Sequence, residues 1–480
     1  MYEAPANTLP DGPYTPTWES LSRVGVPDWY ADAKFGIFIH WGPYCVPAFG
    51  NEWYPRNMYL RGTPEFAHHV ARYGPQSQFG YKDFIPLMTG ERFDAAEWVR
   101  VFCRAGARYI VPVAEHHDGF AMYDSALSRW NAAKMGPRRD VIGELAAAAR
   151  AHGVPFGLSN HRAEHWWYME GGREFDSDVQ DPTLQDFYGP ALPQSQTGTD
   201  AFKAFKADWL ARAIEQVEKY CPSLVYFDTW VERPPLAPYR RHFAAHYYNL
   251  AHQHPGFDRA GVVINYKNDA FAPGSAVIDV ERGQMGEIQP IVWQSCTSTG
   301  LKSWGYVEDE EYKSAEQLVC DLADVVSKNG NLLLNIGPKA DGSLSAADLA
   351  ILDEIGRWLD VYGDAIYGTR PWRVFGEGPT EVPDGHFTDR NRAAFTAEDW
   401  RFTTRGRTTL YAICLGRPRA GGEALIRSLG GALKLWPTRV SRVSVPGAGE
   451  VPWRRDAEGL WVRWPDPLPT PYGCTIQVKA

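Results

Sequence analysis

FGIFIHW (35–41), an apolar run that ends in a histidine and a tryptophan, is the first of eight such runs along this chain. The other seven are RYIVPVAEHH (108–117), VPFGLSNH (154–161), SLVYFDTW (223–230), GVVINYK (261–267), SAVIDVE (275–281), PIVWQSC (290–296) and NLLLNIG (331–337). Each has the length of a β-strand, and Val, Ile and aromatic residues are common in them. Such nearly continuous apolar character is typical of parallel strands that are covered on both faces.

Helical patterns lie between many of these runs. The segment FDAAEWVRVFCRAG (93–106) has Asp94 as a candidate N-cap and Gly106 as a stop, and helical patterns also cover residues 141–153 and 202–220. Residues 314–330 begin with the capping signal Ser-Ala-Glu-Gln and end with Asn-Gly. Eight strands with intervening helices predict a (β/α)₈-like barrel of the TIM type.

The composition changes after Gly363. From about residue 370 the chain is rich in Arg, Gly, Pro, Trp and Val and has short alternating runs such as TTLYAICL, VSRVSVP and LWVRW, which are typical of antiparallel strands. We therefore predict a catalytic barrel over residues 1–367 and a C-terminal antiparallel β-sandwich over residues 368–480. The polar, turn-rich stretch 171–200 is expected to form a long loop over the barrel mouth.

The overall composition excludes several partners. The chain has 480 residues, of which 44% are hydrophobic, and a formal net charge of -9 with His neutral. It has no basic run and no apolar stretch of the roughly 20 residues that a membrane helix needs. We therefore expect neither nucleic acid nor a membrane as partner. The aromatic content of 14% suits a glycan-binding enzyme as well as a large core, because Trp and Tyr offer flat apolar faces with a polar edge.

The cysteines and the N-terminus bear on the compartment. Seven cysteines are widely spaced and form no CxxC pair, so the sequence predicts neither a zinc knuckle nor a disulfide framework. The segment MYEAPANTLPDGPYTPTW (1–18) is polar and has no signal-peptide core. We favour a periplasmic or secreted location with a leader removed, and a cytoplasmic location is the alternative. Whether the chain forms a homo-oligomer stays open.

Polar or aromatic side chains stand at the ends of the predicted strands. They are His40-Trp41, Glu115-His116-His117, Asn160-His161, Asp228, Lys267 and Glu281. Active sites of TIM-type barrels lie at the C-terminal ends of the strands, and an apolar strand has no packing reason to end in a carboxylate. Any one of these residues could instead cap a helix or face solvent, but that explanation weakens when six strands end in this way.

Two carboxylates among these tips, Asp228 and Glu281, meet the minimum requirement for glycoside cleavage. One attacks the anomeric carbon, and the other protonates the leaving oxygen and then activates water. The histidines allow a rival interpretation, since four of them on neighbouring tips could bind zinc. They are His40, His116, His117 and His161. No HExxH motif is present, so we favour a role for these histidines in hydrogen bonding to sugar hydroxyls and expect no metal. The sequence also has no GxSxG motif, which disfavours a Ser nucleophile.

Five motifs give the chain a family resemblance that runs from about Trp29 to Trp372. They are WYADAKFGIFIHWGPYCVPAFGNEWYPRNMY (29–59), EHHDGFAMYDS (115–125), VYFDTW (225–230), SWGY (303–306) and NGNLLLNIGPKADG (329–342). With these motifs the chain resembles glycoside hydrolase family 29, the α-L-fucosidases, and the first two together are specific. The resemblance implies a retaining exo-glycosidase that releases terminal α-L-fucose from a fucosylated oligosaccharide or glycoconjugate, without a cofactor.

The same resemblance implies roles for individual residues. It implies Asp228 as the nucleophile and a β-sandwich after the barrel. The fucose-binding residues that it implies are His40, Glu52, Trp53, His116, His117 and Trp304. In that role Glu52 would bind two hydroxyls at once.

Three positions depart from the family's common pattern. Tyr226 stands two residues before Asp228, where the family usually has Trp. The segment LSNHRAEHWW (158–167), which includes His161, replaces a Tyr/Ser-containing segment, and Lys267 stands where an Arg is common. We expect these residues to line the pocket, so the sugar could be fucose or one of the same configuration such as L-galactose. A non-catalytic glycan-binding protein and a metal-dependent hydrolase are the competing hypotheses.

Glu281 and Glu287 are the two candidates for the acid/base, in IDVERGQMGEIQP (278–290). We favour Glu281, because it ends a strand and the barrel then determines its direction. Glu287 lies in a Gly-rich loop and could swing in. The purely structural explanation for Glu281 would be a salt bridge with Arg282 or with a neighbouring strand.

Overall fold

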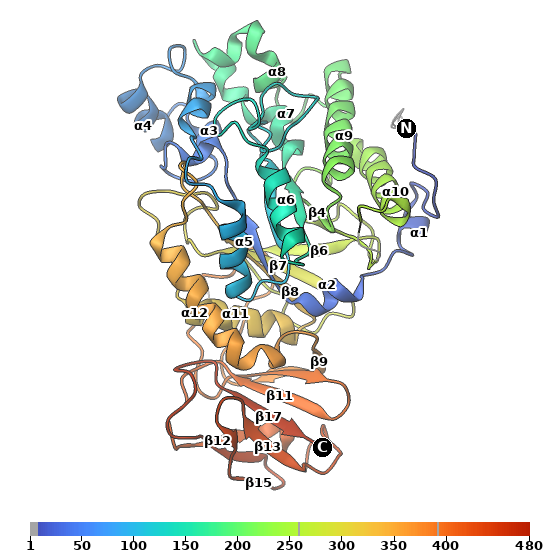
Figure 1. Ribbon diagram of the computed structural model, residues 1–480, viewed down its shortest axis with the longest axis vertical. Helices are drawn as coiled ribbons and strands as arrows, with labels where there is room; N and C mark the ends of the chain where they lie inside the picture. The colour runs from blue at the N-terminus through green and yellow to red at the C-terminus, as the bar shows by residue number, and fades with distance from the viewer. Residues whose placement is uncertain (1–7, 258–259, 391–392) are drawn as a thin grey trace.

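Eight parallel strands close into a barrel, and a smaller antiparallel module follows it (Figure 1). The computed structural model describes residues 8–257, 260–390 and 393–480. The first seven residues of the N-terminal segment considered above lie outside this part. The barrel strands are β1 (Phe35–Ile39), β2 (Ile110–Glu115), β3 (Gly157–Asn160), β4 (Leu224–Phe227), β5 (Val263–Tyr266), β6 (Val277–Glu281), β7 (Trp293–Ser298) and β8 (Gly330–Ile336). Each falls within or overlaps one of the eight predicted runs, so the predicted barrel is confirmed.

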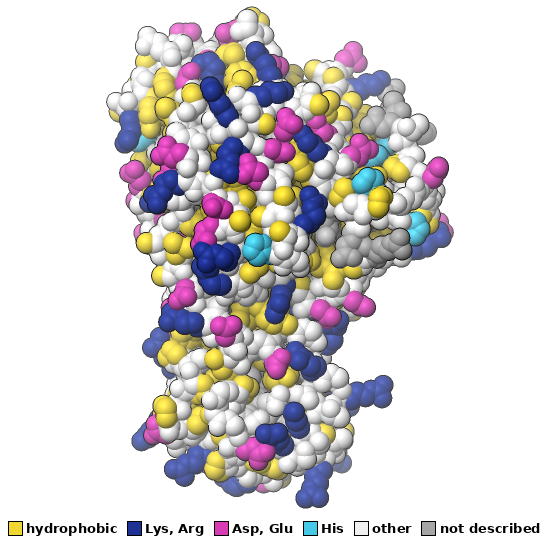
Figure 2. Space-filling view, in the orientation of Figure 1, with side chains coloured by type: hydrophobic (Ala, Val, Ile, Leu, Met, Phe, Trp, Pro, Cys, Tyr) yellow, Lys and Arg dark blue, Asp and Glu magenta, His cyan; other side chains and the backbone are white. Residues whose placement is uncertain are grey.

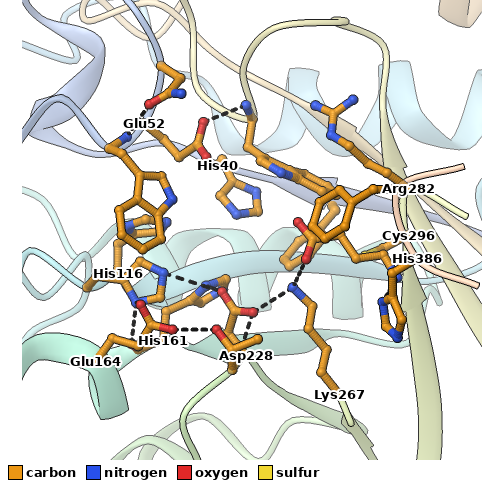
Figure 3. Close-up of a pocket in the computed structure, with 18 of the residues that line it drawn as sticks. His40, Glu52, His116, His161, Glu164, Asp228, Lys267, Arg282, Cys296 and His386 are labelled. Atoms are coloured by element: carbon orange, nitrogen blue, oxygen red, sulfur yellow. Dashed lines mark hydrogen bonds and ion pairs between the residues drawn. The ribbon is translucent and has the colours of Figure 1, made fainter. Parts of the chain in front are cut away.

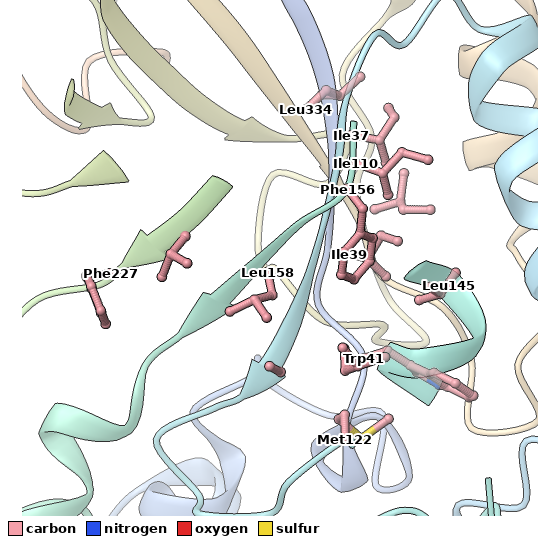
Figure 4. Close-up of a cluster of buried hydrophobic side chains, with 14 of the residues drawn as sticks. Ile37, Ile39, Trp41, Ile110, Met122, Leu145, Phe156, Leu158, Phe227 and Leu334 are labelled. Carbon is pink, nitrogen blue, oxygen red and sulfur yellow. The ribbon is translucent and has the colours of Figure 1, made fainter. Parts of the chain in front are cut away.

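The strands pair in chain order, and β1 also pairs with β8, which closes the barrel. Side chains alternate across each strand, so every second residue points into the barrel. On β1, Ile37 and Ile39 face outward into the layer between strands and helices, where they join Ile110 and Leu334 (Figure 4). Phe38 belongs to the separate cluster inside the barrel. The alternation thereby points His40, two residues after Phe38, into the barrel.

Helices cover most of the barrel's outer face. They are α1 (Trp18–Leu21), α2 (Asp28–Ala33), α3 (Tyr54–Asn57), α4 (Pro64–Tyr73), α5 (Ala95–Arg104), α6 (Val141–Ala151), α7 (His165–Tyr168), α8 (Gln185–Tyr188), α9 (Asp200–Tyr220), α10 (Ala237–Gln253), α11 (Ala315–Ser327) and α12 (Ala346–Tyr362). Asp94 accepts a hydrogen bond from Glu97 N, and Ser314 accepts one from Gln317 N, so both predicted N-caps are confirmed.

Two features differ from the sequence-based expectation. Residues 267–276 and 282–292, all of them described, contain no helix, so β5, β6 and β7 are joined without crossover helices. These connections are each about ten residues long, and a crossover helix needs a connection of a dozen or more. The stretch 171–200 is folded into short helical turns that include α8, and none of its residues, all of which are described, lines the cavity at the barrel mouth.

The C-terminal module is the predicted antiparallel sandwich. Its strands are β9 (Arg370–Glu377), β10 (Trp400–Arg405), β11 (Thr409–Cys414), β12 (Glu423–Ile426), β13 (Arg442–Val445), β14 (Gly449–Glu450), β15 (Trp453–Arg455), β16 (Leu460–Arg463) and β17 (Thr475–Lys479). Six form one sheet in the order β14-β13-β17-β11-β10-β9, and β12-β16-β15 form the other. Residues of both sheets share one core, in which the rings of Trp400 and Trp464 stack 6.0 Å apart.

Helix α11 lies between the two modules and contacts β8 on one side and β9 and β10 on the other (Figure 1). Asp324 of α11 is buried and accepts hydrogen bonds from Arg401 of β10, at 2.5 Å, and from Lys328, at 2.8 Å. Both partners of the buried carboxylate are cations, so its charge is compensated. We keep residue 367 as the proposed boundary between the modules.

The surface agrees with the mixed composition. On the face shown in Figure 2, basic and acidic side chains are interspersed over both modules. Within the described ranges, no helix combines the length and the apolar character that crossing a membrane requires. All seven cysteines are described, and all of them are free thiols.

Candidate active site

A cavity of about 940 Å³ opens where the barrel strands end (Figure 3). All of the site residues that the sequence predicts line it. They are His40, Glu52, Trp53, His116, His117, His161, Tyr226, Asp228, Lys267, Glu281 and Trp304. The cavity therefore brings together residues that lie more than 260 positions apart in the chain.

Asp228 lies at the centre of the site. It follows Phe227, whose ring faces the outer core, so the strand alternation turns its carboxylate inward. Oδ1 accepts hydrogen bonds from Lys267 Nζ at 2.6 Å and from the backbone N–H of Thr229 at 2.8 Å. Oδ2 accepts one from His161 Nδ1 at 2.7 Å and lies 3.4 Å from His117 Nε2. Both oxygens are thus held by donors.

Lys267 joins Asp228 to a second carboxylate. Its ammonium lies 2.6 Å from Asp228 Oδ1 and 2.6 Å from Glu281 Oε2. Burial alone would lower the pKa of Lys267, but the charges of Asp228 and Glu281 raise it well above its usual value. Burial alone would raise the pKa of Asp228, but Lys267 and His161 hold it well below its usual range. The pair is therefore charged at neutral pH.

His161 is held as a neutral ring. Burial is the main reason that its pKa lies below the usual value, although Asp228 opposes the shift. Since Asp228 is an acceptor, the ring proton lies on Nδ1, and Nε2 accepts a hydrogen bond of 2.9 Å from the Ser159 hydroxyl. Both ring nitrogens are therefore occupied.

His117 is the charged histidine of the site. Its Nδ1 donates to the carbonyl of His161 at 2.8 Å, and its Nε2 faces Asp228. Burial would lower its pKa, but the neighbouring carboxylates Glu164 and Asp228 raise it to about 9. The Asp228 carboxylate therefore lies between two cations, His117 and Lys267.

His40 and His116 are neutral because burial and the neighbouring histidines lower the pKa of both. His40 Nδ1 lies 2.7 Å from Asn335 Oδ1 and so carries the proton, whereas His116 Nδ1 is buried with no hydrogen-bond partner among the described residues. Among the described residues, two three-residue groups are close enough together to hold a metal ion. They are His40, His116 and His161, and His117, His161 and Asp228. Both include His161, so a metal bound there would replace the hydrogen bond of its ring either with Ser159 or with Asp228.

Glu52, Trp53 and Trp304 also line the cavity, and Figure 3 shows Glu52 on the side away from Asp228. Glu52 Oε2 accepts hydrogen bonds from Trp304 N at 2.8 Å and from the Ser303 hydroxyl at 3.1 Å, so one of its two oxygens is already engaged. Burial raises the pKa of Glu52. The ring of Trp53 lies 5.3 Å from that of His117.

Tyr226 and Phe38 form the floor, with ring centroids 5.0 Å apart. The Tyr226 hydroxyl donates to Asp279 Oδ1 at 3.1 Å, below the cavity. Asp279 is fully buried, which raises its pKa to about 6, and it also accepts hydrogen bonds from Gln294 and Cys296. The phenol hydroxyl is therefore anchored below the cavity, and the ring faces the cavity.

The two acid/base candidates lie in different environments. Glu281 lines the cavity, and its contact is with Lys267 rather than with Arg282. The guanidinium of Arg282 instead lies over the ring of Trp304, 4.8 Å from its centroid. Glu287 is exposed and is not among the residues that line the cavity.

Comparison with known proteins gives the family. The model of the α-L-fucosidase family matches residues 2–364. The chain belongs to the α-L-fucosidase family. Human plasma α-L-fucosidase is 33% identical over 419 residues, which are 85% of this chain and 82% of that protein. An α-L-fucosidase of Branchiostoma floridae is 32% identical over 446 residues, which are 91% of this chain and 90% of that protein. As a member of this family, the protein is a glycoside hydrolase.

Solved α-fucosidase structures have the same fold. That of Thermotoga maritima α-fucosidase in complex with fucose has a TM-score of 0.74 and 29% identity, over 97% of this chain and 100% of that one. The same bacterial enzyme with a mechanism-based inhibitor has a TM-score of 0.76. The structural similarity therefore covers both the barrel and the C-terminal module of this chain.

Sequence reasoning missed one carboxylate of the candidate active site, Glu164. It lies three residues after His161 and is buried. Its Oε1 accepts a hydrogen bond from the Thr229 hydroxyl, whereas Oε2 has no hydrogen-bond partner among the described residues and lies 3.8 Å from His117 Nδ1. Burial raises its pKa. A helical turn after β3 brings Glu164 to the cavity, and its position in LSNHRAEHWW was the available signal.

Sequence reasoning also missed the contribution of the second module to the cavity at the strand ends. His386, Phe387, Asp389 and Arg390 all line it, although they follow β9. No periodicity or motif marks these residues. Their loop is held at the barrel by pairing with the segment after β6 and by the contacts of Asp389 with Thr297 and Lys313.

Proposed function

We propose that this protein is a retaining exo-α-L-fucosidase with Asp228 as nucleophile and Glu281 as acid/base. The observation that carries the proposal is the shared contact of both carboxylates with Lys267. Each oxygen lies 2.6 Å from the same nitrogen, so the two oxygens are no more than twice that distance apart. This separation is compatible with the roughly 5–5.5 Å between carboxyl groups in retaining glycosidases, which is too short to place a water for direct inversion.

In the first step, an oxygen of Asp228 forms a bond to the anomeric carbon while the glycosidic C–O bond breaks. Glu281 enters this step in its protonated form and gives its proton to the leaving oxygen. Lys267 and His117 keep Asp228 ionised for the attack, and the neutral His161 fixes its orientation. In the second step Glu281 takes a proton from water, the water oxygen bonds to the anomeric carbon, and Asp228 leaves as a carboxylate.

The remaining residues bind the sugar. His40 and His116 are neutral and offer one donor or acceptor each to its hydroxyls, and the free oxygen of Glu52 accepts a hydroxyl hydrogen. Trp53 and Trp304 supply apolar ring faces. We assign His161, Tyr226 and Lys267 to the part of the site around the anomeric carbon. There His161 and Lys267 contact Asp228, and Tyr226 forms the floor.

A panel of nitrophenyl glycosides tests the proposal. We expect turnover of the α-L-fucoside and little or none of D-configured glycosides. The first product seen by proton NMR should be α-L-fucose, because two displacements retain configuration. Release of β-L-fucose would refute the mechanism, preference for the α-L-galactoside would change the assigned sugar, and binding without turnover would support a glycan-binding protein instead.

A further inference from the structure

We propose that residues 385–390, in the connection between β9 and β10, form the binding site for the leaving-group sugar, with the ring of Phe387 as its stacking surface. This inference rests on the proposed roles of Asp228 and Glu281. It assigns a substrate-binding role to the C-terminal module. The ligand class is a pyranose that presents a flat C–H face, as galactose and N-acetylglucosamine do.

The loop is attached to the segment that carries Glu281. Phe387 N donates to the carbonyl of Glu281 at 2.9 Å, Asp389 N donates to that of Arg282 at 2.9 Å, and Gly385 N donates to that of Gln284 at 2.9 Å. In addition, Glu281 N donates to His386 Nδ1 at 3.1 Å. The position of the loop relative to Glu281 is therefore determined by four hydrogen bonds that involve backbone groups.

Phe387 has the features of a ligand-binding residue rather than a core residue. Its side chain is 60% exposed, yet it lines the same cavity as Asp228. Its φ is +56°, and φ of Arg282 on the opposite segment is +45°. A bulky side chain seldom adopts this left-handed conformation, and such strained residues cluster at binding and catalytic sites. Because the Phe387 ring is exposed, packing of the ring does not compensate for the backbone strain.

The chemistry of the reaction places the leaving group beside this ring. Glu281 has to reach the glycosidic oxygen to protonate it, so the sugar attached to that oxygen lies next to Glu281. The loop residues bonded to Glu281 are His386 and Phe387. A cavity of about 940 Å³ is at the upper end of the range for drug-sized ligands, so it has room for more than one monosaccharide.

Three substrates that differ only in the leaving group test the inference. They are α-L-fucosyl fluoride, whose leaving group is too small to reach Phe387, nitrophenyl α-L-fucoside, and the best substrate among fucosyl-galactose and fucosyl-N-acetylglucosamine disaccharides. The variants are Phe387→Ala, Phe387→Tyr and, as a matched control, Leu433→Ala, since Leu433 is also exposed but lies in the sandwich away from the cavity. Thermal melting checks that each variant folds.

We expect Phe387→Ala to lower kcat/KM for the disaccharide by about tenfold and for the fluoride by less than about twofold, because one stacking contact is lost. Phe387→Tyr should keep the disaccharide rate, and Leu433→Ala should change none of the three. Equal losses on fluoride and disaccharide, or no loss on either, would overturn the inference while leaving the proposed fucosidase activity intact. If the unmodified enzyme cleaves none of the three substrates, the proposed function fails and the inference fails with it.

Discussion

His161 donates a 2.7 Å hydrogen bond from Nδ1 to Oδ2 of Asp228, and this contact links the ends of β3 and β4. Ser159 occupies the other ring nitrogen, so the imidazole has one tautomer and one orientation. The residue that departs from the family pattern after the third strand therefore contacts the proposed nucleophile directly. It acts as a neutral donor, while Lys267 and His117 supply the positive charge.

The first prediction concerns Asp228. Asp228→Asn keeps the size of the side chain and removes the carboxylate that attacks the anomeric carbon. We expect kcat for nitrophenyl α-L-fucoside to fall by at least about a thousandfold, since nucleophile variants of hydrolases lose this much or more. Circular dichroism should be unchanged, and near-normal turnover by the folded variant would refute the assignment.

The second prediction concerns the acid/base. Glu281→Ala should lose far more kcat/KM on a disaccharide than on a nitrophenyl fucoside, because an aryl leaving group needs little protonation. Azide should restore turnover of the aryl substrate, since it attacks the glycosyl-enzyme without a base. The product to measure is fucosyl azide.

Two other glutamates serve as comparisons for this experiment. Glu287→Ala should behave as the unmodified enzyme does, because Glu287 is exposed and does not line the cavity. Glu164→Gln is the more demanding comparison, since Glu164 is buried in the cavity with a raised pKa. If either variant showed both the leaving-group dependence and the azide rescue while Glu281→Ala showed neither, the proton would come from that residue.

The third prediction concerns Lys267. Lys267→Met removes the cation that holds the pKa of Asp228 below its usual range, so the Asp228 carboxyl stays protonated to higher pH. We expect kcat to fall about a hundredfold or more, and the acidic limb of the pH–rate profile to move to higher pH. Lys267→Arg should retain more activity because it keeps the charge. Lys434→Met, on the exposed surface of the sandwich, is the control, and an unshifted acidic limb in Lys267→Met would contradict the bridging role.

The fourth prediction concerns stability and pH. The pKa of His117 is raised to about 9 in the folded protein, against about 6.5 in an unfolded chain. The folded state therefore binds the proton more tightly. The stabilisation that results is fully present below about pH 6.5 and is lost as the pH rises through about 9.

His117→Gln isolates this effect. Lys34 has the opposite pH dependence, because burial lowers its pKa to about 7, so only the difference between enzyme and variant is informative. We expect the melting temperature of His117→Gln to lie below that of the unmodified enzyme at pH 6, and the gap to close by about pH 9.5. A gap that stays constant from pH 6 to 9.5 would show that His117 is not charged in the folded state.

The fifth prediction concerns metal. Exhaustive treatment with EDTA should leave kcat unchanged, because the histidine nitrogens nearest Asp228 already have protein partners. Elemental analysis of the untreated enzyme provides the check on metal content. Loss of activity that zinc restores would favour the metal-dependent hydrolase instead.

Much of the site follows from local rules that can be read along the chain. A strand has a period of two, so Phe227 outside the barrel implies Asp228 inside, and the same step from Tyr266 leads to Lys267. Because barrel strands end on one face, residues as distant as His40 and Glu281 could be assigned to one cavity before their contacts were known.

What the sequence by itself determined is therefore the barrel, the sandwich and the set of strand ends that face the cavity. Only the tertiary structure decided how those ends pair: Lys267 between Asp228 and Glu281, His161 on Asp228, and Glu287 outside the cavity. It also brought Phe387 to the cavity from the second module. The physical reason is that side-chain alternation depends on neighbouring residues alone, whereas hydrogen bonds between strand ends and loops depend on the closure of the whole barrel and leave no periodic pattern in the sequence.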